Sequence, residues 1–289
     1  MSRTVTVEDP GPLTTVQDSG RPGHAHLGVP RSGWLDGPAA RLANRIVGND
    51  ETAAVLENVL GGLVLRCDGA AHLAVTGASV DVQVDGRTVD SAGAVGVPAG
   101  GVVSLGRPAT GLRCYVALSG GIDVRSELGS RSTDTLSGLG PNPLRAGDRL
   151  PLGPSYGGLG AGEQVPRRLV SPAALRCLPG PRIDWCPPGL PDRLREATYV
   201  AGSDSDRVGL RLQGPALERR GGELPSEGVV LGAVQLPPDG QPVVFLNDHP
   251  TTGGYPVVAV VVAEDLPRCA QVRPGEEVQL IPLRGAGWR

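Results

Sequence analysis

The chain contains 289 residues, a length typical of two domains. Hydrophobic residues make up 39% of it and aromatic residues only 3%, so its cores must consist mainly of aliphatic side chains. The net charge of −3 and the lack of a basic stripe argue against nucleic-acid binding. The longest apolar run, Val257–Ala263, is too short to cross a membrane, and the N-terminus lacks a signal-peptide pattern, so we expect a cytoplasmic protein.

The first elements lie on either side of a long motif. Thr4–Val7 alternates between polar and apolar residues, which predicts a short strand. Pro10–Pro30 is rich in glycine, proline and polar residues, which predicts a loop. Asp36 then has the position of a helix N-cap, with a proline in the first turn, and apolar residues follow at helical spacing as far as Val47. A second short helix is expected from about Glu51 to Asn58.

The rest of the first half has the pattern of β-strands. From Leu63 the apolar residues recur with a period of two. Asp85-Gly86 is a strong signal for a two-residue hairpin turn. Further strands are expected at Val95–Val97, Val102–Leu105 and Leu112–Leu118.

A glycine-rich stretch without periodicity divides the chain and is the best candidate for a linker. We therefore expect an N-terminal domain over 1–155, a linker over 156–167 and a C-terminal domain over 168–289. In the second half, Pro191–Ala197 predicts a helix, and Asp239-Gly240 predicts a turn between two strands. Strands are expected at Leu175–Leu178, Val208–Leu212, Val229–Leu236, Val243–Leu246, Val257–Val262 and Val278–Leu280.

The two halves therefore share one pattern, in which a loop motif and a short helix precede hairpin-forming strands. The 44 glycines and 28 prolines fit many short strands joined by tight turns. The fold class predicted is mainly β with short helices, in two β-barrel-like domains.

Two residue types limit the possible chemistry. The five cysteines form no CxxC pair and are odd in number, which argues against a disulfide framework and a structural zinc site, so we expect buried, reduced thiols. The chain has no lysine. It therefore has no Schiff-base lysine, no Walker A lysine and no lysine to carry biotin.

The first segment that suggests chemistry is Gly11–Asp36. It combines polar and charged side chains with glycines, whose backbone N–H groups can approach a ligand closely. His24 and His26 are spaced like two metal ligands, but no third ligand is evident nearby, and we predict no metal. The alternative is a turn-rich surface loop. The residues expected to bind substrate or an anion are Gln17, Arg21, Ser32 and Asp36.

The second segment is Asn247–Tyr255. Asp248 follows an apolar strand, where a carboxylate can act as a general base or orient a substrate amide. Hydroxyl groups and glycine N–H groups can bind an oxyanion or a phosphate. The alternative is an Asx-type turn that caps a hairpin. The residues expected to bind are Thr251, Thr252, Gly253, Gly254 and Tyr255.

Two arginines outside these segments are further candidates. Arg207 can clamp an anionic group, or it can form a solvated salt bridge with Asp204 or Asp206. Arg131 lies among hydroxyl side chains in Gly129–Thr133, which resembles a small anion-binding nest but is also typical of an ordinary turn.

Several of these motifs occur together and in a fixed order, and they resemble one family. They include GPLTTVQDSGRPG, GVPRSGWLD, YVALSGGID, LGSRST, SDRVGLRLQGP and DHPTTGGYPVVA. The chain is similar to the biotin-dependent carboxyltransferase family, also called the allophanate hydrolase subunit 2 family, and within it to the 5-oxoprolinase C subunits. The resemblance covers nearly the whole chain and implies two cyclophilin-like β-barrel domains.

The resemblance also implies an activity and partners. It implies a protein that works with subunits A and B to cleave a small amide substrate, 5-oxo-L-proline, to L-glutamate. ATP would be shared with the partner subunits, and no metal or covalent biotin is expected on this chain. Asp248 and Arg207 would be catalytic. Two alternatives remain open, namely a component for biotin-dependent carboxyl transfer to urea and a non-enzymatic regulator that binds a B-type kinase inhibitor.

Overall fold

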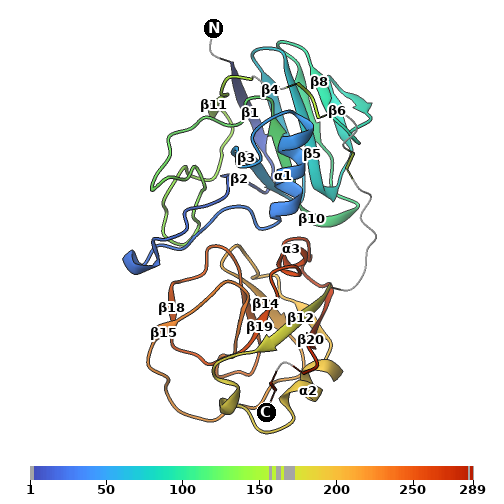
Figure 1. Ribbon diagram of the computed structural model, residues 1–289. Coiled ribbons are helices and arrows are strands. Elements are labelled where there is room, and N and C mark those ends of the chain that lie inside the picture. Colours follow the sequence, from blue (N-terminus) through green and yellow to red (C-terminus); the bar gives the residue numbers. More distant parts are fainter. Residues whose placement is uncertain (1–2, 156–157, 161–163, 166–172, 286, 289) are drawn as a thin grey trace. The chain divides into compact units, whose positions relative to one another are not determined.

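The computed structural model describes residues 3–155, 158–160, 164–165, 173–285 and 287–288. The chain forms two compact units (Figure 1). The first contains residues 1–21, 32–134 and 138–170, and the second contains 22–31, 135–137 and 171–289. The second unit therefore takes in two short segments from the first half of the sequence. Of the predicted linker 156–167, residues 156–157, 161–163 and 166–167 lie outside the described residues.

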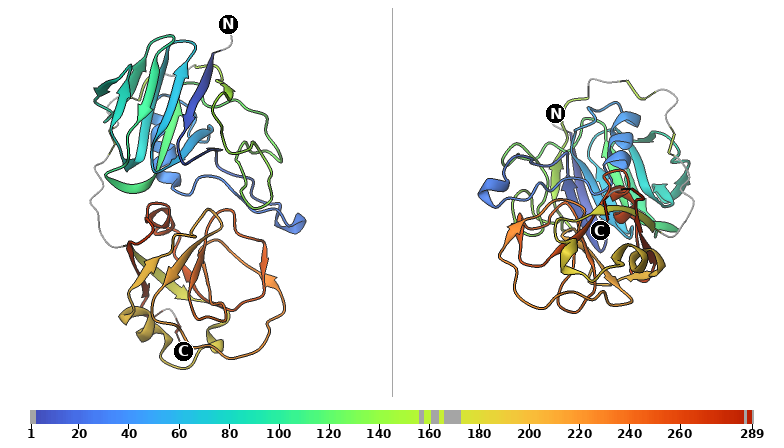
Figure 2. Two further views of the ribbon diagram at one scale, coloured as in Figure 1. Left: turned by 180° about the vertical axis from the view of Figure 1, so that it is seen from behind. Right: turned by 60° about the horizontal axis from the view of Figure 1, so that its bottom comes forward.

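The first unit contains two β-sheets, whose strands lie side by side in the rear view of Figure 2. One sheet has the order β11 (Arg149–Pro151), β1 (Thr4–Pro10), β4 (Leu63–Cys67), β9 (Val102–Leu105), β6 (Val82–Val84) and β7 (Arg87–Val89). The other has the order β2 (Leu13–Gln17), β3 (Val55–Val59), β10 (Thr110–Leu118), β5 (Ala71–Ser79) and β8 (Val95–Val97).

The core of this unit lies between the two sheets. Val5 and Leu65 from the first sheet and Leu56, Leu73 and Val116 from the second belong to one buried cluster, and each is 0 to 1% exposed. The longer strands contribute alternate residues to this cluster, such as Leu63, Leu65 and Cys67 of β4, as the period of two predicts. The mainly β class is confirmed, and the described strands of this unit form two packed sheets.

One helix covers the outer face of the second sheet. α1 (Gly37–Ile46) begins at Asp36, whose side chain accepts a hydrogen bond from the N–H of Ala39 at 3.1 Å. The backbone N–H of Asp36 in turn donates to the hydroxyl oxygen of Tyr115 on β10 at 2.8 Å. The buried face of α1 includes Ala43 and packs against that sheet. The N-cap and the helix predicted from the sequence are confirmed.

Two local predictions in the first half are wrong. The predicted helix Glu51–Asn58 is a turn followed by β3. The Asp50 carboxylate accepts a hydrogen bond from the N–H of Thr52 at 2.7 Å and holds this turn. β3 is then buried between β2 and β10, and this long-range pairing overrides a helical pattern of moderate strength. The loop predicted over Pro10–Pro30 contains β2, which pairs with β3 from Leu13 to Gln17.

The hairpin signals give correct pairings. Asp85 and Gly86 both have positive φ, 48° and 75°, as a type I′ turn between β6 and β7 requires. Asp239-Gly240 lies in the longer connection between β16 (Ala233–Gln235) and β17 (Val243–Phe245), which also pair in antiparallel register. The predicted strand Val229–Leu236 is therefore shorter in the structure.

The second unit contains a closed barrel of seven strands in the described residues. The barrel closes because β12 pairs with β19 in antiparallel and with β20 in parallel register. Its order is β12 (Ala173–Pro179), β19 (Val257–Val261), β16, β17, β14 (Gly209–Gln213), β13 (Tyr199–Ala201) and β20 (Glu277–Pro282). A separate ribbon pairs β15 (Glu227–Gly228) with β18 (Thr252–Gly253).

Short helices complete the second unit. α2 (Leu190–Glu196) confirms the helix predicted over Pro191–Ala197. The others are α3 (Leu266–Cys269) and the 3-10 turns η1 (Ala25–Leu27) and η2 (Ile183–Trp185). All five cysteines are buried, and no disulfide joins them.

Glycine is required at one turn of the first unit. Gly61 has φ +72°, and a Cβ there would lie 1.9 Å from the carbonyl oxygen of Gly106. Gly86 has nearly the same φ, +75°, but a Cβ there would meet nothing within 4 Å. We predict that Gly86→Ala costs about 1 kcal/mol, the strain of a left-handed residue. Gly61→Ala should cost roughly 3 kcal/mol or more, because the overpacking adds to that strain.

Thermal unfolding of the two variants measures this difference, and equal midpoints would contradict the steric argument.

Candidate functional site

The centre of the second predicted segment is a buried ion pair. Asp248 follows β17 and is fully buried, while Arg207, which precedes β14, is 2% exposed. The guanidinium donates from Nε to Oδ2 and from Nη2 to Oδ1, each at 2.9 Å. The backbone N–H of Asp248 also donates to the carbonyl of Arg207 at 3.0 Å. Arg207 therefore pairs with Asp248, and neither of the predicted partners, Asp204 and Asp206, takes that place.

A third chain segment completes this centre. Thr135 donates to Oδ2 of Asp248 from its backbone N–H at 2.9 Å and from its hydroxyl at 2.8 Å. The carboxylate thus accepts four hydrogen bonds, which hold it in one orientation. This geometry favours a carboxylate that positions the segment after β17 over one that takes a proton from a substrate.

The Thr-Thr-Gly-Gly segment is part of a β-ribbon. Thr252 pairs with Gly228, and Gly253 pairs with Glu227. A Cβ at Gly253 would lie 2.6 Å from Nε2 of Gln235, which donates to the carbonyl of Tyr255 at 3.1 Å. A side chain at 253 would therefore displace the Gln235 amide, and strand pairing engages part of the backbone that was predicted to bind an oxyanion.

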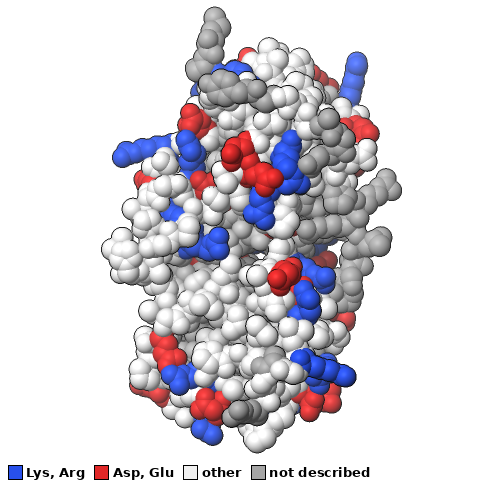
Figure 3. Space-filling model, viewed as in Figure 1, with Lys and Arg blue, Asp and Glu red and all other residues white. Residues whose placement is uncertain are grey.

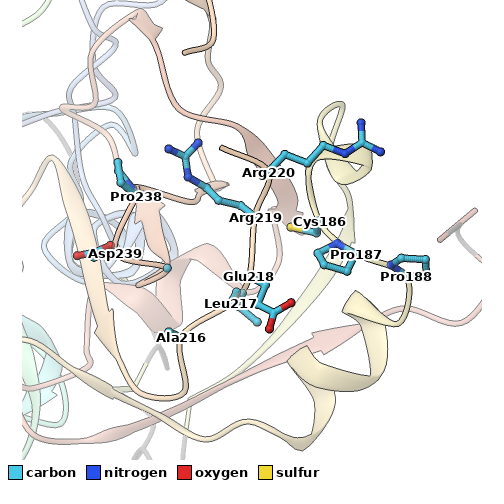
Figure 4. Close-up of a pocket in the computed structure, with 11 residues that line it drawn as sticks. Cys186, Pro187, Pro188, Ala216, Leu217, Glu218, Arg219, Arg220, Pro238 and Asp239 are labelled. Carbon is cyan, nitrogen blue, oxygen red and sulfur yellow. The ribbon is translucent and has the colours of Figure 1, made fainter. Parts of the chain in front are cut away.

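Tyr255, at the end of this segment, is 44% exposed and lies against an arginine that the sequence did not single out. The guanidinium carbon of Arg219 lies 6.0 Å from the centroid of the Tyr255 ring and 5.9 Å from that of Trp185. Both distances are within the range of cation–π attraction. Arg219 also lines a pocket of about 540 Å³ in the second unit (Figure 4).

His249 lies beside the ion pair. It is 8% exposed, and its ring stacks on Phe245 with centroids 5.7 Å apart. Nδ1 lies 2.7 Å from the carbonyl oxygen of Pro250, which can only accept, so Nδ1 carries the proton. Burial lowers the pKa of His249 below its usual value of 6.5, and the charge of Arg31 acts in the same direction, although Asp248 opposes both.

The first predicted segment is organised by Asp18 in the first unit. Its carboxylate accepts hydrogen bonds from the backbone N–H groups of Gly20 at 2.8 Å and Arg131 at 2.6 Å. It also accepts from the hydroxyls of Ser130 at 2.5 Å and Ser132 at 2.7 Å. Asp18 therefore joins the loop after β2 to the Gly129–Thr133 turn.

Arg21 is 1% exposed and lies in the same network. It donates from Nη1 to the hydroxyl of Ser32 at 3.0 Å and from Nη2 to the carbonyl of Ser132 at 2.5 Å. Its Nη1 is also 4.0 Å from the carboxylate of Asp134. Gln17 is fully buried and donates to the carbonyl of Thr133 at 2.9 Å. The structure thus brings Gln17, Arg21 and Ser32 together.

The other two predicted residues of the first unit have separate places. Asp36 is the N-cap of α1. The side chain of Arg131 points to the surface, where Nη2 lies 2.6 Å from the carboxylate of Asp123. The backbone of Arg131, and not its guanidinium, joins the Asp18 network.

Charge and metal-binding groups are dispersed in the described part of the chain. On the face shown in Figure 3, arginines lie next to acidic side chains. No group of three or more His, Cys, Asp or Glu residues there is arranged to hold a metal ion. None of the helices described has the length and apolarity to cross a membrane.

Comparison with known proteins identifies the family. The family model of the carboxyltransferase domain, subdomains A and B, matches residues 27–282. The chain belongs to this family. The family predicted from the ordered motifs is therefore confirmed.

Curated relatives fall into two groups. The chain is 38% identical over 275 residues to the 5-oxoprolinase C subunit of Escherichia coli (strain K12), a match that covers 94% of this chain and 88% of that protein. It is 33% identical over 301 residues to urea amidolyase of Saccharomyces cerevisiae, a match that covers 95% of this chain but only 16% of that protein.

Solved structures share the fold. The crystal structure of TTHA0988 matches with a TM-score of 0.87 and 38% identity over 96% of this chain, which spans 55% of that one. Urea amidolyase of K. lactis matches with a TM-score of 0.88 and 30% identity over 97% of this chain, which spans 19% of that one. The chain thus corresponds to about half of TTHA0988 and to a small part of the amidolyase.

Two residues at these centres were missed by sequence reasoning. Thr135 has no local signal, because its partner Asp248 is 113 positions away. Asp18 lies in a quoted motif, but its hydrogen-bond donors are 112 to 114 positions away, apart from Gly20.

The ion pair makes a prediction about stability. Asp248→Ala leaves the buried Arg207 guanidinium without its carboxylate, so we expect a loss of about 3–5 kcal/mol in the free energy of unfolding. The control is Asp204→Ala, which removes an exposed carboxylate 3.3 Å from Arg211 and should cost about 0–1 kcal/mol. Urea unfolding of both variants measures the two losses. Similar small losses would contradict the role assigned to Asp248.

His249 makes a prediction about pH. Because its pKa in the folded protein is lowered, the unfolded chain binds more protons, and stability is lost as the pH falls below 6.5 towards the folded pKa. We expect the unfolding midpoint to fall less between pH 7.5 and pH 5.5 in His249→Gln than in the unmodified protein. His72→Gln, at an exposed position, is the control and should keep the original pH dependence. An unchanged pH dependence in His249→Gln would show that the effect lies elsewhere.

Proposed function

We propose that this chain is the C subunit of an ATP-dependent 5-oxoprolinase that works with subunits A and B to cleave 5-oxo-L-proline to L-glutamate. The similarity to the 5-oxoprolinase C subunit of Escherichia coli carries this proposal, since the two chains correspond over 94% and 88% of their lengths. A second relative of the same name, from Haemophilus influenzae, is 32% identical over 92% of this chain.

The reaction explains why ATP is needed. A ring amide resists attack by water at neutral pH. Transfer of a phosphoryl group from ATP to the amide oxygen makes that oxygen part of a good leaving group. Water then adds to the same carbon, and the C–N bond breaks as the ring nitrogen takes up a proton, which leaves an acyl phosphate on the open chain. A second water hydrolyses this acyl phosphate and releases L-glutamate and inorganic phosphate. The enzyme must hold the amide and two anions, the substrate carboxylate and the triphosphate, with water excluded until the phosphoryl group has transferred.

Two features that could bind a phosphate are already engaged in this chain. Arg207 gives Nε and Nη2 to Asp248. The first turn of α1 gives the N–H of Ala39 to the carboxylate of Asp36, which would repel a phosphate. The chain also has no lysine. These features support binding of the triphosphate mainly by the partner subunits, while this chain supplies part of the wall of a shared site.

The predicted site residues then have defined tasks in the proposed function. Asp248 and Arg207 hold the start of the segment that ends in Tyr255, and Gln17, Arg21 and Ser32 hold the loop after β2. Their burial and their many internal hydrogen bonds support positioning roles. The exposed part of the second segment, from Thr252 to Tyr255, is the part available to a ligand or a partner.

A second candidate function is carboxyl transfer to urea in a biotin-dependent system. The urea amidolyases of Saccharomyces cerevisiae and Lachancea kluyveri favour it, at 33% and 32% identity over 95% and 96% of this chain. Because this chain has no lysine, biotin would be carried by another chain or domain. The correspondence with only 16% and 17% of those proteins makes this the weaker candidate.

Reconstitution tests the two candidates. The purified A and B subunits and this chain are mixed with ATP and 5-oxo-L-proline, and glutamate and ADP are measured together. We expect both products only when all three proteins are present, because this chain supplies part of the shared site. Parallel mixtures each omit one protein or replace 5-oxo-L-proline with urea. Equal glutamate formation without this chain would refute the proposal.

A further inference from the structure

The pocket beside Arg219 is built from three segments of the second unit (Figure 4). One wall is Cys186–Pro188, which follows η2, and the opposite wall is Pro238–Gly240, from the connection between β16 and β17. Ala216–Arg220 lies between the two walls. The volume, about 540 Å³, is in the usual range of small-molecule sites.

Backbone hydrogen bonds hold these segments together. The N–H of Arg220 donates to the carbonyl of Trp185 at 2.7 Å, and the N–H of Leu217 donates to the carbonyl of Gly240 at 3.0 Å. A Cβ at Gly240 would lie 2.7 Å from the carbonyl oxygen of Leu217, so only glycine permits this close approach. The pocket is therefore a fixed feature of the fold, and binding a ligand requires little ordering of its walls.

Arg219 differs from the arginines around it. Arg182 forms two hydrogen bonds with Glu227, and Arg193 donates to the carbonyls of Pro187 and Pro188. Within the described residues, Arg219 has no hydrogen bond and no ion pair. Its guanidinium instead lies within cation–π range of the rings of Trp185 and Tyr255.

Because no described residue accepts a hydrogen bond from this guanidinium, its N–H donors remain for a ligand. These donors lie in one plane and match the two oxygens of a carboxylate. Arg219 is half-buried, so its charge is less screened than that of a fully exposed arginine. In Figure 4 its side chain extends towards Pro238, whereas Arg220 extends in the opposite direction and the carboxylate of Glu218 points away from it.

The charges around the pocket select the kind of anion. Two arginines, Arg219 and Arg220, and two acids, Glu218 and Asp239, line it, so its formal charge is zero. Arg220 also lies 3.9 Å from Asp184, and Asp239 already accepts the N–H of Gln241 at 3.0 Å. One guanidinium in such a setting suits a single negative charge better than the two charges of a phosphate.

We propose that this pocket binds a small monocarboxylate, with Arg219 as the residue that pairs with the carboxylate and Trp185 and Tyr255 holding the guanidinium in place. This site is distinct from the Arg207–Asp248 centre, where the guanidinium is already paired with the carboxylate of Asp248. It does not depend on the proposed reaction, although 5-oxo-L-proline, with one carboxylate and a five-membered ring, is a ligand of the right class.

Calorimetric titration of the full-length chain tests the site with four probes. 5-Oxo-L-proline and acetate carry one carboxylate, 2-pyrrolidinone has the lactam ring without it, and inorganic phosphate carries more charge. We expect saturable binding of the carboxylates and none of 2-pyrrolidinone or phosphate. Binding of acetate alone supports the pocket and counts against the lactam acid as its ligand. No saturable binding of either carboxylate, or equal binding of phosphate, refutes the proposal.

Substitutions test whether Arg219 is the residue that binds the carboxylate. Arg219→Gln should weaken carboxylate binding roughly tenfold or more, the loss expected for hydrogen bonds to a charged group, and Arg219→Lys should retain part of it. Arg220→Gln is the matched control, since it lines the same pocket but extends away from Arg219, and its loss of binding should be much smaller. Circular dichroism confirms folding of each variant. An equal loss in Arg219→Gln and Arg220→Gln, or no loss in either, overturns the assignment.

The binding assay and the reconstitution test the two proposals separately. If the isolated chain binds carboxylates but the three-protein mixture forms no glutamate, the proposed reaction is refuted and the proposed binding site is not.

Discussion

The second unit depends on one buried carboxylate, that of Asp248. Burying a charge is costly unless it is paired and fully hydrogen-bonded. Two donors from Arg207 and two from Thr135 satisfy this condition. The four bonds join three segments that are distant in sequence, and they fix where the chain goes after β17. β18 and Tyr255 come directly after Asp248 in the chain, so the ion pair fixes where they begin. The ion pair itself does not line the pocket beside Arg219.

The first unit uses the same device at Asp18. Its carboxylate accepts from two backbone N–H groups and two serine hydroxyls, and it thereby fixes the loop after β2. Arg21 then satisfies the carbonyl of Ser132 and the hydroxyl of Ser32. In both units the charged residues of the family motifs mainly shape loops. Motif residues of this kind can be required for an activity without touching a substrate, because each loop has one geometry only while its carboxylate is fully paired.

Local signals predicted local structure well. The Asp85-Gly86 turn, the Asp36 cap with α1, and the pairing on either side of Asp239-Gly240 each depend on a few neighbouring residues, and the structure confirms them. β3 was mistaken for a helix because its burial comes from β2 and β10, which are distant in sequence. For the same reason, the sequence identified Arg207 and Asp248 as candidate site residues but did not pair them with each other. It gave no signal for Thr135, whose partner Asp248 is 113 positions away. Arg219 could not be singled out from the sequence, because the two rings that it contacts, those of Trp185 and Tyr255, belong to distant segments of the chain.

The contrast between Arg207 and Arg219 shows how one unit separates stability from anion recognition. An incoming anion can reach Arg207 only by displacing Asp248, which is held at the same site by its own backbone and by Thr135. Such an intramolecular partner acts at a high effective concentration and leaves a buried carboxylate unpaired when it is displaced. At Arg219 no described acid has to be displaced, and the guanidinium lies within cation–π range of two rings. Anion binding in this unit is therefore favoured at the arginine whose partners are aromatic, and stability depends on the arginine whose partner is acidic.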